Sequence, residues 1–352
     1  DEAAIEARGL QPVQPLLALV DQAATPEDFA VLIGRLAGEG VGGPIGTYVA
    51  QDPKNATRYL ASVGGKVRVY IPDRMTEGYG PNAPALRKLK AEGAAVAITV
   101  DCGTTAFDAL SDAKAAGLDV LVIDHHTAEP SLPEAFAVVN PNRLDETSPH
   151  RTLAAVGVTF LLVVGLNRAL RKAGWFASRP EPDPLAWLDL VALGTVCDVV
   201  PLVGVNRALV AQGLKVLRRR ANAGLAALAD VARVQTEPEA YHLGFLLGPR
   251  VNAGGRVGRS DLGARLLALD DASEAKTIAA ELDRFNAERQ AIEALVLEQA
   301  MARAGEFADA PVMVVGSEGW HAGVIGIVAS RLKDHFNRCL LYTSPSPRDV
   351  EE

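Results

Sequence analysis

The sequence is poor in cysteine and has no long apolar run. Its three cysteines, Cys102, Cys197 and Cys339, lie far apart and form no CxxC pair. They therefore build neither a disulfide framework nor a zinc knuckle, and we expect reduced thiols. No apolar run reaches the roughly 18 residues that a membrane helix needs. Residues 1–10, DEAAIEARGL, also lack the layout of a signal peptide. We expect a cytoplasmic protein without a membrane partner.

Positive charge is also scarce. Lys and Arg number 35 against 43 Asp and Glu, which gives a net charge of -8. A protein that coats nucleic acid is normally basic, so this balance argues against that class. It does not exclude an enzyme that grips a strand locally, because metal-binding carboxylates lower the net charge. Hydrophobic residues are abundant, at 49% of 352 residues, which is enough for a large core and two domains.

Short β-rich runs alternate with Ala-rich segments in the first half of the chain. This order predicts an α/β fold with a parallel sheet and helices on both faces. The second half reads as mainly helical, with a stretch long enough to connect two domains and then one more strand and helix. We expect strands at 66–72, 94–100, 118–123, 135–140 and 310–316, and helices at 82–92, 104–116, 152–173, 184–197 and 262–304, with a Gly-rich turn opening a last helix after 319.

Polar residues follow two of the expected strands directly. One strand ends in Asp101, and the next ends in Asp124, His125 and His126. Because the carboxyl ends of parallel strands meet at one edge of a sheet, these groups should lie together. Asp101 has a competing interpretation as a helix N-cap. Two adjacent histidines at a strand end give a fold no evident benefit, so they favour a site for Mn²⁺ or Mg²⁺.

A third acid fits the same metal site. Asp198 is the only charge in the fifteen residues LVALGTVCDVVPLVG. A buried carboxylate needs a cation or a strong donor facing it. The alternatives for Asp198 are a helix N-cap or a solvated turn.

Seven segments in order resemble the DHH phosphoesterase superfamily and, within it, the RecJ-type exonucleases, which degrade single-stranded DNA from the 5′ end. They are YIPDRMTEGYGPN (70–82), VDCGTT (100–105), VIDHH (122–126), GTVCDVVPL (194–202), GPRVNAGGRVG (248–258), NAERQ (286–290) and GWHAGVIGIVASRLK (319–333). The resemblance implies a phosphodiesterase with two Mn²⁺ or Mg²⁺ ions. It implies a DHH domain joined by a long helix to a DHHA1 domain, single-stranded DNA between them, and single-strand-binding proteins or helicases as partners.

The resemblance also implies roles for particular residues. Asp101, His125 and Asp198 would bind metal. Asp124 would orient the first imidazole, that of His125, and His126 would approach the scissile phosphate. A second group would hold phosphates of the DNA backbone: Arg250, Asn252 and Arg256 in a Gly-rich turn, and His321, Gly323 and Gly326 at the start of a helix. The glycines after 319 are also consistent with a helix packed closely on a strand, and Tyr79 with either base stacking or a hydrophobic wall.

Two departures from the family pattern affect the expected activity. The family's first Asp motif should fall near 44–49, where the sequence reads PIGTYV and contains no acid. A second metal would then be held weakly or not at all. The chain also ends in LLYTSPSPRDVEE, which has neither strand nor helix period.

We therefore divide the chain into five parts. They are an atypical region (1–65), a DHH domain (66–235), a phosphate-gripping turn with a connecting helix (236–305), a partial DHHA1 domain (306–339) and a disordered tail foreign to the original gene (340–352). The function expected is exonuclease activity on single-stranded DNA, impaired by the missing motif. The alternatives are a phosphodiesterase for short oligonucleotides or cyclic dinucleotides, and an inactive nucleic-acid-binding protein.

Overall fold

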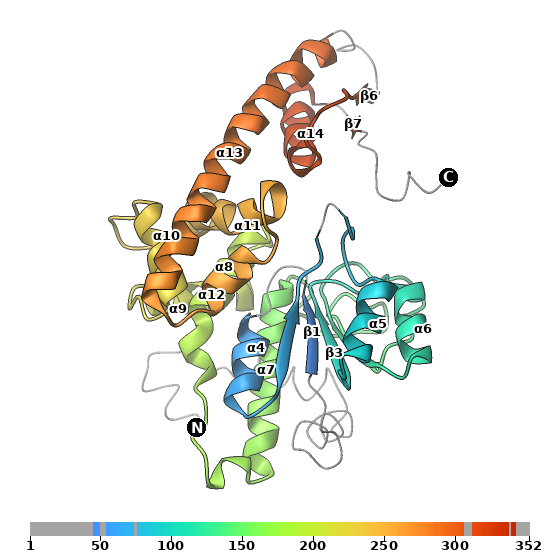
Figure 1. Ribbon diagram of the computed structural model, residues 1–352, viewed down its shortest axis with the longest axis vertical. Coiled ribbons are helices and arrows are strands. Elements are labelled where there is room, and N and C mark those ends of the chain that lie inside the picture. The colour runs from blue at the N-terminus through green and yellow to red at the C-terminus, as the bar shows by residue number, and fades with distance from the viewer. Residues whose placement is uncertain (1–44, 50–53, 74–75, 306–311, 338, 343–352) are drawn as a thin grey trace.

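The computed structural model describes residues 45–49, 54–73, 76–305, 312–337 and 339–342. Figure 1 shows a part with a central sheet, a mainly helical part beside it, and a long helix that leads to a small third part. No helix in the described ranges is both long and apolar enough to cross a bilayer. The expectations for residues 1–44 and 343–352 fall outside the described residues.

A five-stranded parallel sheet, in the order β2-β1-β3-β4-β5, forms the first part. The expected α/β class with a parallel sheet is thereby confirmed. The central strand β1, residues 45–49, differs from the expectation, which treats residues 1–65 as an atypical region outside the sheet. The sheet begins upstream of that boundary. Its strands are β1 (Ile45–Val49), β2 (Val67–Tyr70), β3 (Val96–Val100), β4 (Asp119–Ile123) and β5 (Ala137–Val139).

Helices cover both faces of this sheet (Figure 1). Successive side chains of a strand point to opposite faces. Ile98 and Ile123 accordingly pack with α4 and α7, whereas Ala97 and Val122 pack with α5 and α6. Strands buried on both faces explain why β3 and β4 read as continuous apolar runs. The helices are α4 (Lys54–Ser62), α5 (Ala83–Ala91), α6 (Phe107–Ala115) and α7 (Ala155–Lys172).

The second part is helical and has its own apolar core. The turn expected at 248–258 is wrong, because these residues form helix α11. Its glycines allow close packing instead: a Cβ on Gly248 would lie 2.4 Å from Cys197 Sγ, and one on Gly254 would lie 2.5 Å from the Arg259 carbonyl oxygen. Between α7 and this part, η1 (Trp175–Ala177) and η2 (Pro184–Trp187) pack on the core of the sheet part. The elements that follow are α8 (Leu188–Cys197), α9 (Gly204–Leu217), α10 (Ala223–Val231), the π-helix η3 (His242–Leu247), α11 (Gly248–Val257) and α12 (Leu262–Ala268).

The long helical stretch expected at 262–304 is two helices, because the chain leaves the helix after Ala268. The second, α13 (Ala272–Gly305), has 34 residues and runs from the helical part to the third part (Figure 1). There β6 (Val312–Val315) pairs in parallel with β7 (Cys339–Tyr342), and α14 (Ala322–Phe336) packs on α13. The expected tail from residue 340 is therefore wrong for its first three residues, which belong to β7.

Candidate metal and nucleic-acid site

The strand ends bring Asp101, Asp124 and the two histidines to one edge of the sheet. Val100 and Ile123 are register partners in β3 and β4, so the polar residues that follow them lie at the same level. The backbone N–H of Asp101 donates to the Ile123 carbonyl at 2.9 Å, which extends the pairing by one residue. Asp101 has a φ of 62°, a left-handed conformation that few residues other than glycine adopt. This geometry turns its side chain out of the strand.

Asp198 reaches the same place from helix α8. It caps the C-terminal end of that helix, and its backbone N–H donates to the Gly194 carbonyl at 3.0 Å. A Cβ on Gly194 would lie 2.9 Å from Val156 Cγ1, so this glycine lets α8 approach α7 closely. The close approach places Asp198 opposite the sheet edge.

Three buried polar atoms converge there without a hydrogen-bond partner. His125 Nε2 lies 3.2 Å from Asp101 Oδ1 and 3.3 Å from Asp198 Oδ2. Within the described part of the chain, none of the three atoms has a hydrogen bond. Unsatisfied buried polar atoms are costly. Two carboxylates and one imidazole around one point form a donor set that fits Mn²⁺ or Mg²⁺, so the residues present fit a divalent cation.

Asp124 is not part of that set. The expectation that it orients the His125 imidazole is wrong, because its carboxylate meets only the backbone N–H of His125 and pairs with the imidazole of His126 instead. Asp124 is 1% exposed, and its Oδ1 lies 2.7 Å from His126 Nδ1. Its Oδ2 accepts from the Thr104 N–H at 3.0 Å. Burial opposes ionisation of Asp124, but the bonds from His126 and Thr104 prevail and lower its pKa to about 2. An ionised Asp124 holds the proton of His126 on Nδ1 and leaves Nε2 for another group.

The surrounding charges also shift the pKa of the other groups in the cluster. The Asp124 hydrogen bond raises the pKa of His126. Burial lowers the pKa of His125, but the nearby carboxylates of Asp101 and Asp198 more than offset this and raise it overall. Burial raises the pKa of Asp198. In the absence of a cation the cluster therefore tends to hold protons, which a bound cation would displace.

Two asparagines that the sequence analysis missed hold the histidines from behind. Asn140 Nδ2 donates to the His126 carbonyl at 2.8 Å and to Thr104 Oγ1 at 2.9 Å. Asn142 Nδ2 donates to the His125 carbonyl at 2.5 Å. The available signal was the segment NPN (140–142) directly after β5, which reads as an ordinary turn. Tyr79 also supports the site, because its hydroxyl donates to the Asp101 carbonyl at 2.8 Å.

The residues expected to hold phosphates lie in two places. Asn252 on α11 lines a cavity together with Asp101 and Asp198. Arg250 points elsewhere: its Nε donates to Asp283 Oδ1 on α13 at 2.7 Å, and its Nη1 donates to the Leu246 carbonyl at 2.8 Å. The structure therefore joins Asn252 to the sheet-edge cluster and ties Arg250 to the connecting helix.

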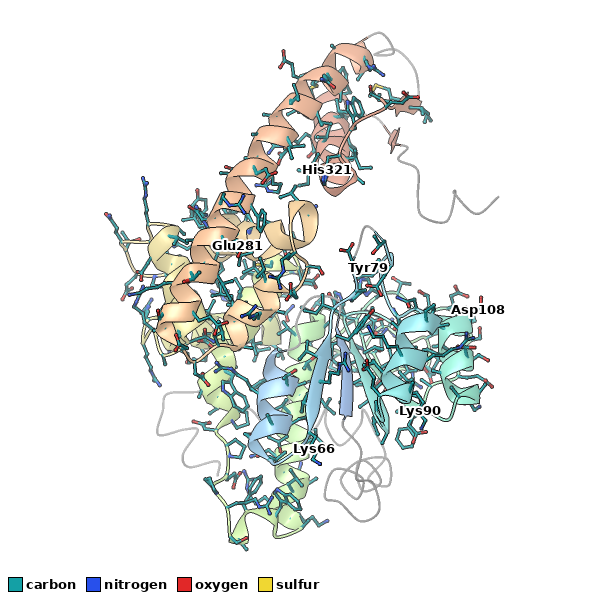
Figure 2. All side chains as sticks on the ribbon, in the orientation of Figure 1. Lys66, Tyr79, Lys90, Asp108, Glu281 and His321 are labelled. Atoms are coloured by element: carbon teal, nitrogen blue, oxygen red, sulfur yellow. The ribbon has the colours of Figure 1, made fainter. Side chains whose placement is uncertain are left out.

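The remaining expected residues lie where α11 meets α14. Arg256 Nη1 donates to the Gly323 carbonyl at 3.0 Å, and a Cβ on Gly323 would lie 2.2 Å from the Arg256 carbonyl oxygen. His321 caps α14 by accepting from the Gly323 N–H at 3.1 Å. Gly326 is exposed one turn further along α14. Figure 2 shows His321 at the start of α14 and Tyr79 at the top of the sheet, on parts of the molecule that face each other.

Comparisons with known proteins agree with this geometry. The model of the DHH family, N-terminal domain, matches residues 41–195. The single-stranded-DNA-specific exonuclease RecJ of Dickeya dadantii (strain 3937) is 40% identical over 82% of this chain and 52% of its own length. That of Bacillus subtilis (strain 168) is 40% identical over 79% and 34%. The chain thus spans about half the length, or less, of these curated relatives.

Solved structures extend the likeness to the whole arrangement of parts. The crystal structure of exonuclease RecJ bound to manganese matches with a TM-score of 0.77 at 34% identity, over 90% of this chain and 79% of that one. RecJ from Thermus thermophilus in complex with Mn²⁺ matches with a TM-score of 0.75 at 32% identity, over 97% and 49%. The chain belongs to the RecJ family of DHH phosphoesterases.

Proposed function

We propose that the chain is a metal-dependent nuclease that removes nucleotides from the 5′ end of single-stranded DNA. The observation that carries this is the convergence of Asp101, His125 and Asp198, whose facing atoms are buried and unsatisfied. The cavity in front of them is also lined by Asn252 of α11. Relatives named as single-stranded-DNA-specific exonucleases supply the substrate class, and the resemblance of the seven segments supplies the direction.

Each part of the site has a task in this reaction. Asp101, His125 and Asp198 would hold Mn²⁺ or Mg²⁺, which supplies Lewis-acid stabilisation of the charge that develops at a scissile phosphate. His126 would contact the phosphate through Nε2, because Asp124 retains its Nδ1 proton. Asn252, Arg256 and the N-terminal end of α14, with His321, Gly323 and Gly326, would hold phosphates of the bound strand. Arg250 would join them only after separating from Asp283.

One observation favours a second candidate, a DHH protein that binds nucleic acid without cleaving it. Strand β1 lies beside β3, with Val49 as the partner of Val100 next to Asp101. Its sequence, IGTYV, brings no carboxylate to that edge. Among the residues that the structure describes, the three ligands would hold one cation, and β1 adds none for a second one.

Cleavage of end-labelled single-stranded DNA in Mn²⁺, Mg²⁺ or chelator tests the proposal. We expect mononucleotides to leave the 5′ end with metal and none with chelator. His125→Ala should abolish the reaction, while His150→Ala, a half-buried histidine outside the cluster, should leave it intact. Binding without cleavage in every metal would favour the second candidate. Cleavage that persists in His125→Ala would contradict the metal site.

A further inference from the structure

An exposed pair of aromatic rings lies outside the site described above. Tyr241 and Phe245 are 59% and 70% exposed, although large aromatic side chains are normally mostly buried. Their rings stack on one another with centroids 5.1 Å apart and planes 25° apart. Leu243 and Leu247, on the same short helix, are buried, so the helix is anchored by one face and presents its rings on the other.

The rings lie on the helix that also enters the catalytic cavity. Helix η3 continues directly into α11, and η3 is π-helical, a form frequent at functional sites. The exposed residues between 241 and 252 are Tyr241, Phe245 and Asn252, spaced by whole helical turns. At about 1.5 Å per residue, Phe245 lies roughly 10 Å along the axis from Asn252, and Tyr241 roughly 16 Å. A strand that leaves the cavity along this helix would meet the rings within a few nucleotides.

Arginines lie near the rings. A cavity next to η3 is lined by Arg218, Arg220, Glu237 and His242, and the His242 ring meets the Tyr241 ring with centroids 5.8 Å apart. Arg218 and Arg220 are paired with Glu237 and Asp230. Arg219 is exposed and forms no ion pair with any residue that the structure describes.

We propose that Tyr241 and Phe245 form an accessory platform on which bases of single-stranded DNA stack outside the catalytic cavity, with the arginines at 218–220 beside its phosphates. Every base has a π-face, so stacking needs no particular sequence. A single strand suits the rings better than an apolar protein segment for two reasons. The helix that carries the rings continues into the cavity lined by Asn252, and Arg219, which has no ion pair among the described residues, can meet a phosphate. The inference rests on the proposed function for its ligand, and it adds a contact that holds the part of the strand not being cleaved.

The test uses the whole chain and two single-stranded oligonucleotides, one long and one short. Binding is measured by fluorescence anisotropy in chelator, and hydrolysis is measured in Mn²⁺. The variant Tyr241→Ala/Phe245→Ala should bind a 15-nucleotide dT strand roughly 10-fold or more weakly. It should hydrolyse a 4-nucleotide strand at the unchanged rate. Tyr241→Phe/Phe245→Tyr keeps both rings and should restore binding. Leu295→Ala removes an exposed apolar side chain from α13 and serves as the matched control.

Two further arms separate stacking from other causes. A 15-nucleotide strand with abasic sites keeps its phosphates but lacks bases to stack. It should bind weakly, and with equal affinity, to the parent and to Tyr241→Ala/Phe245→Ala. If the parent and Tyr241→Ala/Phe245→Ala bind the dT strand with equal affinity, the platform is overturned. Hydrolysis of single-stranded DNA by the parent would in that case still support the proposed function. Ring-dependent binding without hydrolysis would support the platform and contradict the proposed function. Ring-dependent binding of an acidic peptide but not of dT would assign the surface to a protein partner and overturn the inference.

Discussion

Asn140 illustrates how a residue that takes no direct part in the reaction can position the residues of a site. It is 3% exposed, and its amide group donates to the His126 carbonyl and to Thr104 Oγ1. Thr104 in turn donates its backbone N–H to Asp124, which orients His126. A single side chain therefore ties together the histidine-bearing backbone and the carboxylate behind it. Partners of this kind normally affect metal affinity or activity by 10- to 100-fold.

Replacing Asn140 should lower activity through the site rather than through stability alone. For Asn140→Ala we expect a fall of about 10- to 100-fold in the rate of DNA hydrolysis and a higher Mn²⁺ requirement. The measurement is a Mn²⁺ titration of hydrolysis. Asn167→Ala is the control, because Asn167 is also buried but bonds to Glu181, away from the site. If both variants lose activity in proportion to their melting temperature, Asn140 has no positioning role.

Asp189 gives a pH dependence of stability that is independent of the site. It is 2% exposed in the first turn of α8, and burial raises its pKa to about 6. The folded state therefore binds the Asp189 proton more tightly than the unfolded state does. The stability that comes from this proton is fully present below about pH 4 and is lost as the pH rises through 6. Near neutral pH the charged group costs roughly 3 kcal/mol, since one pKa unit corresponds to about 1.4 kcal/mol.

Asp189→Asn should remove this cost. The amide oxygen can still accept from the Leu190 N–H, as Asp189 Oδ1 does at 2.8 Å. We expect the variant to be more stable than the parent by about 1–3 kcal/mol at pH 7.5 and by much less at pH 4.5, measured by urea unfolding. Asp334→Asn, on the exposed side of α14, should show no such difference between the two pH values. A gain that is the same at both values would contradict the assignment.

Helices α13 and α14 are joined by a buried charge network. Glu293 is 5% exposed and accepts from Arg289, which is 9% exposed, and from Arg331 on α14. Arg289 Nη2 also donates to Asn286 at 3.1 Å. A buried ion pair is valuable chiefly because each charge would be costly alone. The network makes Glu293 the point at which the third part is fixed to the connecting helix.

Glu293→Ala and Arg331→Ala should therefore differ strongly in stability. Removing Glu293 leaves Arg289 buried without its carboxylate, and we expect a loss of roughly 3–5 kcal/mol. The Arg331 side chain is 58% exposed, and its removal should cost no more than about 1 kcal/mol. Denaturant unfolding measures both. Equal losses would show that the exposed and buried pairs contribute alike, contrary to this account.

The elements that the sequence predicts well are those with an uninterrupted apolar pattern. Strands β3 and β4 and their polar ends were expected because buried parallel strands are apolar throughout and the ligands follow directly. Helix α11 was mistaken for a turn because glycine disfavours isolated helices. Its glycines are required by contacts with Cys197 and with the Arg259 backbone, which are distant in sequence or visible only after folding. Asn140 was missed for a related reason, since its partners are 14 and 36 residues away.

The arrangement of the whole molecule depends on the contact between α11 and α14. The resemblance to the RecJ family, inferred from seven segments, is confirmed by relatives and by solved structures. What the segments did not reveal is that Arg256 and Gly323 touch each other backbone to backbone. That contact fixes the start of α14 against α11, in addition to the packing of α14 on α13.

Gly323→Ala should move these parts away from each other without unfolding either. A Cβ would lie 2.2 Å from the Arg256 carbonyl oxygen, a backbone atom that cannot rotate away. We expect a loss of about 10- to 100-fold in kcat/KM on single-stranded DNA, since small misplacements have effects of this size. Gly255→Ala is the control, because the nearest atom to its Cβ would be 4.0 Å away. Unchanged activity in both variants would mean that this contact does not position the strand.

The length of α13 has a mechanical consequence. A helix of 34 residues is about 50 Å long. A bend of only about 10° at its middle would swing the far end by about 4 Å, and long helices commonly curve. The helix therefore acts as a lever that converts a slight change of angle near its midpoint into a displacement of several ångströms at its far end. The contact of Arg256 with Gly323, where α11 meets α14, would limit how far the third part can follow such a bend.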